Sequence, residues 1–551
     1  MRNPWIGRFG LVAALVPGLA ACNSHPLKQV ELKSEQEKDG NVSVAINRDV
    51  DILFVIDNSR SMALEQGTLA RNFGPLLERL ELPDVKANYR IAVTTTDNGG
   101  TYCIGKDAGD FKAQSCLSRA VDFQTTTGED YFDVACADVC NHEQIEILPS
   151  KIFQNAEEKP RPWIENIAGV TNIGGDVSPV EAFQCLGPQG VTGCGFESPL
   201  ESMRLGLLQA NEDVSSEYGF MRPGAILAVV FVTDEADCSA RYGEVPDPWL
   251  LDGSRALWSE ENRNNGDLTS EVCWYAGVEC EQSPDGSQEC WAVDKKADGS
   301  ETDSEDDAVL YPLARYTAFM DEIQERKRKI NPDQDVLVAV LTGVPTDYDG
   351  GRIHYGAGPD PQFVLDHGIG AGCDSVNGKA APPVRLAEFA SQYKGDESDV
   401  NLFSVCDGDY TKAMETIAEA IGKQVRPPCV ETCVADEDPS TPGLQHACQV
   451  EEEYITPSGA TEIVQIPRCI TTDDGFEFPE GADVCYRSLT DFEERTESSV
   501  DDMSATCSDE GWNLELSFER RDNAPPPAGA RVQARCSVSR FTSSDCPSLT
   551  A

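Results

Sequence analysis

The stretch from Val50 to Met62, VDILFVIDNSRSM, constrains the fold of this chain more than any other. Its apolar part, ILFVI, is short, mostly β-branched and free of polar alternation, which predicts a strand covered on both faces. The residues that follow, up to Leu82, show the apolar spacing of a helix. A turn rich in oxygen, with Asp57, Ser59 and Ser61, therefore joins a buried strand to a helix.

The side chains on this turn suit a hard divalent cation. One carboxylate and two hydroxyls supply oxygen ligands but little negative charge, so a bound ion stays electrophilic and can take a carboxylate from another molecule. In open α/β sheets, ligands bind at the carboxyl ends of the strands, which is where this turn is expected. The alternative is that Asp57 or Ser59 only caps the following helix by accepting hydrogen bonds from its free backbone amides.

Four further apolar segments have strand character and alternate with helical patterns. We expect these strands at Tyr89–Thr94, Ala225–Thr233, Val336–Leu341 and Leu402–Val405. The alternation predicts an α/β fold with a doubly wound, mostly parallel sheet over residues 48–428. Two loop-rich segments, at about 98–192 and 239–308, are expected as insertions into this domain.

One more acidic residue is expected near the same edge of the sheet. Asp234 follows its strand as Asp57 follows the first one, and the two strands should be neighbours. Two carboxylates that meet there without a cation repel each other. Glu197 stands just before a helix that begins at Pro199. From the residues alone, its carboxylate complements the positive end of that helix.

Three motifs, FVIDNSRSM, GCGFESPLESM and VFVTDEADCS, together carry a family resemblance. They resemble von Willebrand factor A domains with a metal-ion-dependent adhesion site, as found in lipoproteins of predatory and soil-dwelling Gram-negative bacteria. The resemblance implies a Rossmann-type sheet and one Mg²⁺ or Ca²⁺ ion held directly by Ser59 and Ser61. It implies Asp57 and Asp234 as ligands or as holders of bound water. The family has a metal-contacting Thr in the second motif, and Glu197 is a candidate replacement because no Thr stands there.

The amino terminus is expected to be a lipoprotein signal. Residues 1–21 contain a short apolar segment that could not span a bilayer, which is typical of secretory signal peptides. Leu19-Ala20-Ala21-Cys22 resembles a bacterial lipobox, so Cys22 is expected to carry the lipid and to begin the mature chain. Asn23 is not the Asp that commonly signals inner-membrane retention, which favours the outer membrane. Residues 22–47 are expected to be a polar tether.

Charge and cysteine content fit a protein of the cell envelope. The formal net charge of −51 repels nucleic acid and anionic lipid, so only the terminal lipid is expected to contact the membrane. Of 21 Cys, setting Cys22 aside leaves an even number, which favours disulfides in an exported protein. Zinc is the competing interpretation, but the chain has five His and no pair of CxxC motifs. Cys373 and Cys406 lie on elements that should adjoin in this fold, and we predict a disulfide between them.

Residues 429–551 differ in kind from the sheet domain. They contain eight Cys and short alternating runs separated by Pro and Gly. This pattern predicts a small, Cys-rich β domain that depends on disulfides because it cannot bury enough apolar surface by itself.

The sequence leaves three classes of function open. The first is a surface-binding module, in which the cation accepts a carboxylate from a partner protein or an extracellular ligand. The second is an envelope-assembly scaffold that uses the same fold without adhesion. The third is a secreted hydrolase, which the absence of GxSxG, HExxH and a Cys-His pair disfavours. A metal position that a partner's carboxylate fills is a binding device, so we expect no enzyme activity.

Overall fold

The computed structural model describes residues 41–546 except for a series of gaps. The gaps are 47, 83–84, 100–107, 153–155, 241–255, 267, 283–287, 331–333, 354, 357, 397, 426–428, 442, 457, 459, 473–474, 492–498, 522–523, 525 and 528–529. The expected signal peptide, the expected lipidation site Cys22 and most of the expected tether lie outside the described residues. No helix in the described part of the chain combines the length and the apolarity needed to cross a membrane.

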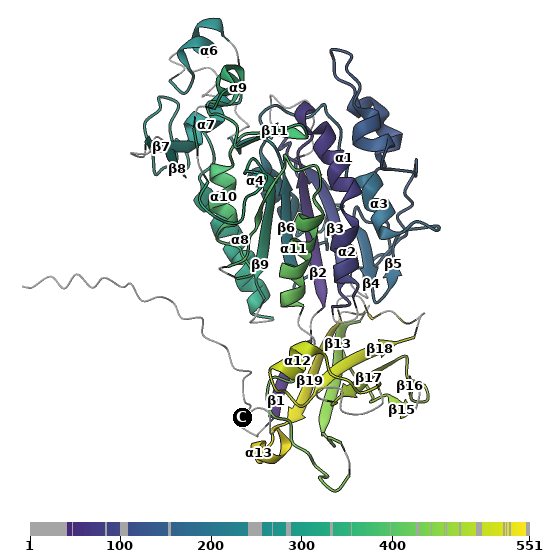
Figure 1. Cartoon of the computed structure of the whole chain (residues 1–551). Coiled ribbons are helices and arrows are strands. Elements are labelled where there is room, and N and C mark those ends of the chain that lie inside the picture. Colours follow the sequence, from purple (N-terminus) through teal and green to yellow (C-terminus); the bar gives the residue numbers. More distant parts are fainter. Residues whose placement is uncertain are drawn as a thin grey trace, which may run out of the picture.

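A seven-stranded sheet forms the centre of the molecule (Figure 1). Its spatial order is β12-β9-β6-β2-β3-β4-β5. The strands are β2 (Asp49–Ile56), β3 (Asn88–Thr95), β4 (Ile164–Ile167), β5 (Val170–Thr171), β6 (Ile226–Val232), β9 (Val336–Thr342) and β12 (Leu402–Ser404). The pairs from β12 to β3 are parallel, whereas β4 and β5 pair antiparallel. The predicted α/β class with a mostly parallel sheet is confirmed.

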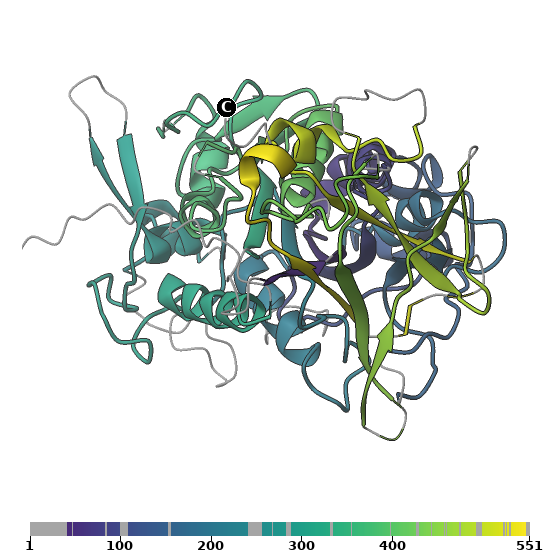
Figure 2. The same ribbon diagram turned by 90° about the horizontal axis from the view of Figure 1, so that it is seen from below.

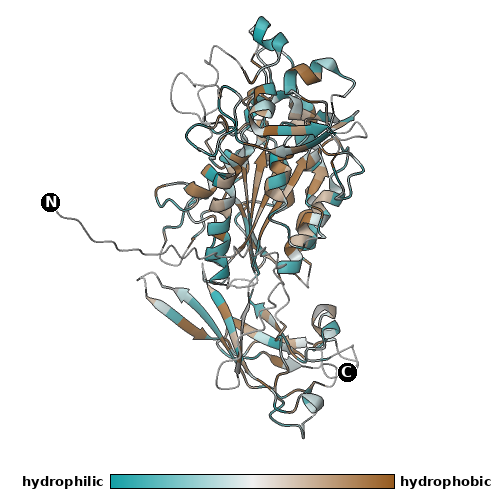
Figure 3. Cartoon of the chain, turned by 90° about the vertical axis from the view of Figure 1, so that its left-hand side faces the viewer, coloured by the Kyte–Doolittle hydropathy of each residue, from teal (hydrophilic) through white to brown (hydrophobic). Residues whose placement is uncertain are grey.

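Helices cover both faces of the sheet, as the unbroken apolar strands predict. Alternate residues of β2 point to opposite faces, so Phe54 packs in one core and Leu53 and Val55 in the other. The first core receives α1 (Ala63–Arg71), α2 (Gly74–Leu80), α3 (Pro179–Leu186) and α11 (Thr411–Gln424). The second receives α4 (Pro199–Gln209), α8 (Leu313–Arg328) and α10 (Val384–Ala390). Figure 3 shows the brown, hydrophobic strands between helices with teal outer parts.

The helix expected after the first strand is broken into pieces. A 3-10 turn, η1 (Arg60–Met62), precedes α1, and α1 ends before α2 begins at Gly74. Pro75 stands in the first turn of α2, where its missing N–H costs nothing but where it could not continue α1. The break leaves α1 as a short helix whose amino end faces the carboxyl end of β2.

The strand order places a ligand crevice at a defined point. From β2 the chain goes to β3 on one side, and it later returns to β6 on the other side. The carboxyl ends of β2 and β6 are therefore the topological switch point, where open α/β sheets bind ligands. Asp57 and Asp234 directly follow these two strands.

The expected insertion at 98–192 is not wholly separate from the sheet. Its residues form β4, β5 and α3, which extend the sheet and its core, as well as η2 (Cys116–Phe123) and η3 (Asp133–Ala137). The four-residue β4 has polar Glu165 and Asn166 at its centre, so its sequence lacks the apolar run of a strand. Glu165 is held instead by a buried ion pair, with 2.6 Å between its Oε2 and Nε of Arg90 on β3.

The second insertion lies beside the carboxyl end of the sheet and packs on α10. It contains α6 (Glu260–Asn265), α7 (Glu271–Gly277), β7 (Val278–Gln282) and β8 (Gln288–Ala292). The later loop adds α9 (Pro361–His367) and a hairpin of β10 (Cys373–Ser375) and β11 (Gly378–Ala380). Cys373 thus lies in a short strand and not directly before a helix, because α10 begins only at Val384, after Pro382 and Pro383.

The predicted disulfide framework is confirmed, including the Cys373–Cys406 pair. Cys194 is also disulfide-bonded. The other described pairs are Cys116–Cys136, Cys140–Cys185, Cys238–Cys273, Cys280–Cys290, Cys429–Cys507, Cys433–Cys546, Cys448–Cys536 and Cys469–Cys485. Every insertion and the carboxyl-terminal domain is closed by such links.

Replacing both Cys373 and Cys406 with Ser should lower the free energy of unfolding by about 3–4 kcal/mol. The two residues are 33 apart in sequence, and the chain-entropy model gives that value for a loop of this length. The measurement is urea denaturation of the double variant and the wild type under oxidising conditions. A loss below about 1 kcal/mol would mean that the link does not restrain the unfolded chain as the model requires.

The carboxyl-terminal domain is β-rich, and it includes part of the expected tether. Its main sheet has the order β1-β19-β13-β14, and a hairpin of β17 and β18 packs beside it. The strands are β1 (Asn41–Ile46), β13 (Cys448–Ile455), β14 (Thr461–Gln465), β15 (Ile470–Thr472), β16 (Gly475–Glu477), β17 (Val484–Leu489), β18 (Glu515–Arg520) and β19 (Arg531–Ser537), with short helices α12 (Ala505–Asp509) and α13 (Thr542–Asp545). The tether interpretation was wrong for residues 41–46, because NVSVAI alternates and pairs with β19, burying Val42 completely.

The carboxyl-terminal domain and the crevice lie at opposite ends of the sheet domain. Figure 1 shows this domain below the amino-terminal ends of the parallel strands, and in Figure 2, seen from below, it lies in front of the sheet domain. Consistent with that position, the charges of Glu515 and Glu519 act on Arg48, which directly precedes β2.

Acid should destabilise the carboxyl-terminal domain through His446. Burial lowers the pKa of His446 from 6.5 to about 4, its Nε2 lies 2.5 Å from Oγ of Ser488, and its Nδ1 is buried without a partner among the described residues. The unfolded chain binds the proton more readily, so this stability is present above pH ~6.5 and is lost as the pH falls toward ~4, by about 3 kcal/mol in all. His446→Gln should flatten the slope of urea stability between those pH values. An unchanged slope in the variant would contradict this assignment.

Candidate metal centre

Asp57 is held at the end of β2 by contacts with both neighbouring segments. Its side chain is buried, and its Oδ2 accepts a hydrogen bond from Oγ1 of Thr233 at 2.6 Å. Its Oδ1 accepts one from the backbone N–H of Ser59 at 2.8 Å, which closes the turn. These two hydrogen bonds fix the carboxylate of Asp57 at the switch point of the sheet.

The two serines of the turn place their hydroxyls together. Oγ of Ser59 lies 3.1 Å from Oγ of Ser61, with Ser59 buried and Ser61 exposed. Ser59 occupies the cap position of η1 but makes no capping hydrogen bond with its side chain. Ser59 therefore does not cap the helix with its side chain. The exposed hydroxyl of Ser61 lies on the open side of the crevice.

Asp234 faces the same crevice from β6. The register aligns Ile56 with Val232, so the residues after the two strands are neighbours. Asp234 is buried, its Oδ1 has no hydrogen-bond partner within the described residues, and a hydrogen bond from Ser61 favours its charged form. Asp234 thus connects the Ser61 side of the turn to the neighbouring strand.

Glu197 points into the protein rather than along the solvent-exposed end of α4. It is 1% exposed, its Oε2 accepts a hydrogen bond from Oγ1 of Thr96 after β3, and its Oε1 lacks a partner within the described residues. Ser198 occupies the cap position of α4, so Glu197 stands outside the helix. Its backbone is fixed as well, because its carbonyl accepts from N of Cys238 at 2.7 Å.

Sequence reasoning missed one acidic residue of the crevice, Glu65 on α1. Glu65 is 3% exposed, and its Oε2 has no hydrogen-bond partner among the residues described. The β10–β11 hairpin covers it so closely that a Cβ on Gly378 would lie 2.2 Å from its Oε1. Its spacing of four residues from Ser61, about one helical turn, was the available signal. An acidic residue in the first turn of a helix is ordinary, which hid that signal.

The crevice concentrates negative charge in a buried place. Burial raises the pKa of Asp57 to about 6 and that of Glu65 to about 7. Burial, followed by the charge of Asp57, holds the pKa values of Glu197 and Asp234 well above their ordinary range. Such a group of carboxylates must either bind protons or be neutralised by a cation.

The donor set fits one divalent cation that has hydroxyl or water ligands. Unpartnered oxygens on Glu65, Glu197 and Asp234 are available to an ion or to its bound water. Within the described residues, the three carboxylates whose ligand atoms all lie within 4.8 Å of one another are Asp491, Asp501 and Asp502, in the carboxyl-terminal domain. The crevice carboxylates are farther apart, so they cannot enclose an ion without the serine hydroxyls or water.

A Ser, a His and a Glu also meet beside the crevice, but not in the geometry of a hydrolase. Oγ of Ser270 and Oε2 of Glu235 both lie against Nδ1 of His367, at 3.1 and 3.0 Å. A catalytic relay needs the hydroxyl and the carboxylate on different ring nitrogens. Burial lowers the pKa of His367, but the charge and hydrogen bond of Glu235 outweigh it and raise the pKa, which favours an ion pair.

Comparisons with known proteins give no family for this chain. No protein-family model matches it, and no curated protein matches it. Among solved structures, the pilus adhesin SpaC from Lactobacillus rhamnosus GG gives a TM-score of 0.27 at 10% identity, with 91% of this chain and 42% of that chain covered. Its open conformation gives 0.26 at 8%, with the same coverage. The pilus adhesin RrgA from Streptococcus pneumoniae gives 0.22 at 8%, with 91% and 58% covered.

These TM-scores are too low to establish a shared fold. This chain also spans less than two thirds of the length of each of these adhesins. The functional assignment therefore depends on the geometry of the crevice.

Proposed function

We propose that this protein is a lipid-anchored, non-enzymatic binding protein of the cell envelope with a von Willebrand A-like domain. Its crevice binds one Mg²⁺ or Ca²⁺ ion, and the ion takes a carboxylate from a partner protein or an extracellular ligand. Ser59 and Ser61 hold the ion, with Asp57 and Asp234 as ligands or as holders of its water. When bound, the ion supplies an electrophilic position for an external carboxylate.

One observation carries this proposal: the paired hydroxyls of Ser59 and Ser61 lie at the switch point with Asp57 and Asp234 beside them. Hydroxyl ligands leave an ion more positive than carboxylate ligands would, so it retains affinity for an acidic group from outside. The exposure of Ser61 gives that group a way in. A buried ion enclosed by carboxylates alone would have no such function.

The arrangement of the two ends of the molecule also supports a surface-binding role. The first described strand, β1, belongs to the carboxyl-terminal domain, at the opposite end of the sheet domain from the crevice (Figure 1). A lipid on Cys22 would anchor the chain at that end. The crevice would then face away from the membrane, toward partners.

A pull-down from envelope extracts tests this function. The bait is the protein without its lipid, incubated in buffers that contain Mg²⁺, Ca²⁺ or a chelator. Proteins captured with cation, and lost both in the chelator and by a Ser61→Ala variant, would support carboxylate capture by the ion. Capture that the chelator and the variant leave unchanged would favour a scaffold that uses the fold without its ion.

Glu197 decides how electrophilic the ion is, and calorimetry on Glu197→Gln tells its two roles apart. Because Oε1 of Glu197 is buried and unpartnered within the described residues, we expect it to hold a water of the ion, since direct ligation by a third carboxylate would weaken the ion's hold on an external acidic group. The variant should bind Ca²⁺ about tenfold more weakly, the loss typical of a charge-assisted contact. Equal affinity would assign Glu197 a structural role, through its hydrogen bond with Thr96 alone.

A further inference from the structure

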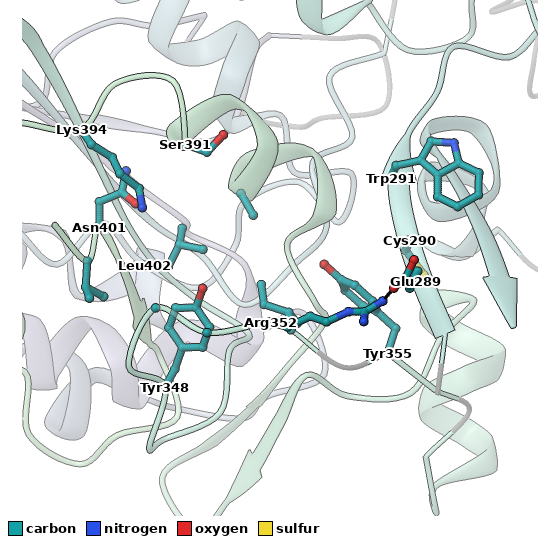
Figure 4. Close-up of a pocket in the computed structure, with 15 residues that line it drawn as sticks. Glu289, Cys290, Trp291, Tyr348, Arg352, Tyr355, Ser391, Lys394, Asn401 and Leu402 are labelled. Atoms are coloured by element: carbon teal, nitrogen blue, oxygen red, sulfur yellow. Dashed lines mark ion pairs between the residues drawn. The ribbon is translucent and has the colours of Figure 1, made fainter. Parts of the chain in front are cut away.

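A second site lies on the flank of the sheet domain, away from the crevice. A cavity of about 480 Å³ opens between the β7–β8 hairpin, the loop after β9 and the start of β12 (Figure 4). Its volume falls within the range of small-molecule sites, about 300–1,000 Å³. The polar and aromatic residues that line it include Glu289, Trp291, Tyr348, Arg352, Tyr355, Lys394 and Asn401.

The walls combine aromatic rings with neutral hydrogen-bonding groups. Tyr348 and Tyr355 direct their hydroxyls into the cavity (Figure 4). Asn401 also lines it, but its amide nitrogen already donates to the carbonyls of Val338 and Ala390, at 2.9 and 2.7 Å, so only its Oδ1 is left for a ligand. Neither tyrosine hydroxyl hydrogen-bonds to another side chain or to the backbone in the described part of the protein. Burial raises the pKa of Tyr355 to about 12, so this hydroxyl stays a neutral donor at physiological pH. The rim adds Trp291, an indole that is 42% exposed.

The side chains that line the cavity include more cations than acids. The whole chain has 95 Asp and Glu against 44 Lys and Arg, whereas the cavity wall has two cations against one acid. Two further acids lie close by, because, besides burial, the charge of Glu388 raises the pKa of Tyr355 and the charge of Asp349 raises that of Tyr348. Lys394 makes no ion pair with the described residues. Arg352 pairs with Glu289, but both side chains are about half exposed, and exposed ion pairs contribute little. The nearby Asp399 is neutralised by Lys423 at 2.7 Å.

We propose that this cavity binds an acidic saccharide, a short sugar chain that carries carboxylates on its rings. The flat C–H faces of sugar rings pack on aromatic side chains, here Tyr348 and Tyr355. The ring hydroxyls match the two phenols and the amide oxygen of Asn401, and the carboxylate matches Lys394 and Arg352. An acidic peptide would bring more charge and fewer hydroxyls than the wall is built to receive.

The test is calorimetry of the full chain with trigalacturonic acid, in EDTA so that the crevice has no cation. We expect a Kd in about the micromolar to millimolar range, and about tenfold weaker binding of the methyl-esterified trisaccharide, which keeps the rings but lacks the charge. Lys394→Met should weaken trigalacturonate binding by about tenfold and leave the ester unaffected. Glu289→Gln should strengthen trigalacturonate binding, because it removes a repelling charge and frees Arg352.

Three results would overturn the proposal. The first is no binding of trigalacturonic acid at about 10 mM. The second is equal binding of trigalacturonic acid and its methyl ester, with no effect of Lys394→Met. The third is binding of triglutamate in place of the saccharide. Tyr348→Phe, which removes only a hydroxyl and keeps the ring packed, provides a second variant that should fold and should weaken both sugars. Since the titration is done in EDTA, its outcome is independent of ion binding in the crevice.

Discussion

The Asp57→Asn variant is expected to lose divalent-cation binding, with the Kd for Ca²⁺ or Mg²⁺ raised about 100-fold or more. Asp57 is the buried carboxylate at the centre of the crevice, fixed by Thr233 and by the backbone of Ser59. Asn keeps the shape and the hydrogen bond from Ser59, so the fold should persist while the charge that attracts the ion is lost. A loss of about 3 kcal/mol corresponds to that change in Kd. Calorimetry with each cation measures it.

The matched control is Asp298→Asn, which removes one negative charge from an exposed loop. Among the described residues, the hydrogen bonds that the Asp298 side chain accepts come from N and Oγ of Ser300, at 2.9 and 2.6 Å, and Asp298 lies far in sequence from the crevice residues. The Asp298→Asn variant should bind each cation with the same Kd as the wild type. In a chelator, Asp57→Asn should melt no lower than the wild type, because it removes repulsion among buried carboxylates. Unchanged cation affinity in Asp57→Asn would contradict the assignment of the site.

Phe54→Ala should cost about 3–5 kcal/mol of unfolding free energy, the loss typical of a fully buried aromatic residue. Phe54 is completely buried in β2, three residues before Asp57. Its ring centroid lies 5.8 Å from that of Phe73, which stands between α1 and α2, and 5.0 Å from that of Phe183 on α3. The substitution leaves a cavity between these rings and the sheet.

Urea denaturation measures this loss, and Val121→Ala is its control. Val121 is 72% exposed, so its substitution should change stability by no more than about 0.5 kcal/mol. A loss below about 1 kcal/mol for Phe54→Ala would show that the core can close around the missing ring. Phe54→Leu, which fills most of the volume, should keep cation binding and lose less stability.

The parallel strands of the sheet could be predicted from the sequence for a physical reason. A strand buried on both faces needs an unbroken apolar run, and β2, β6 and β9 each have one. Because parallel strands end at the same edge, Asp57 and Asp234 could be placed together from their positions alone. The same reasoning predicted the Cys373–Cys406 disulfide, although not the hairpin in which Cys373 lies.

The parts that could not be predicted depend on contacts distant in sequence. Residues 164–167 form a strand because Arg90 on β3 neutralises Glu165, and a four-residue polar segment carries no periodic signal. Val42 belongs to a strand only because β19, almost 500 residues later, supplies the partner. Glu65 enters the crevice because the β10–β11 hairpin folds over it, which no local pattern encodes.

The most direct test of a cation in the crevice is anomalous X-ray diffraction from crystals of the protein soaked in Mn²⁺, which substitutes for Mg²⁺ at oxygen sites. One anomalous peak is expected beside the hydroxyls of Ser59 and Ser61, between the ends of β2 and β6, and it should vanish in the Asp57→Asn variant. A peak only at Asp491, Asp501 and Asp502 in the carboxyl-terminal domain, or no peak at all, would contradict the account.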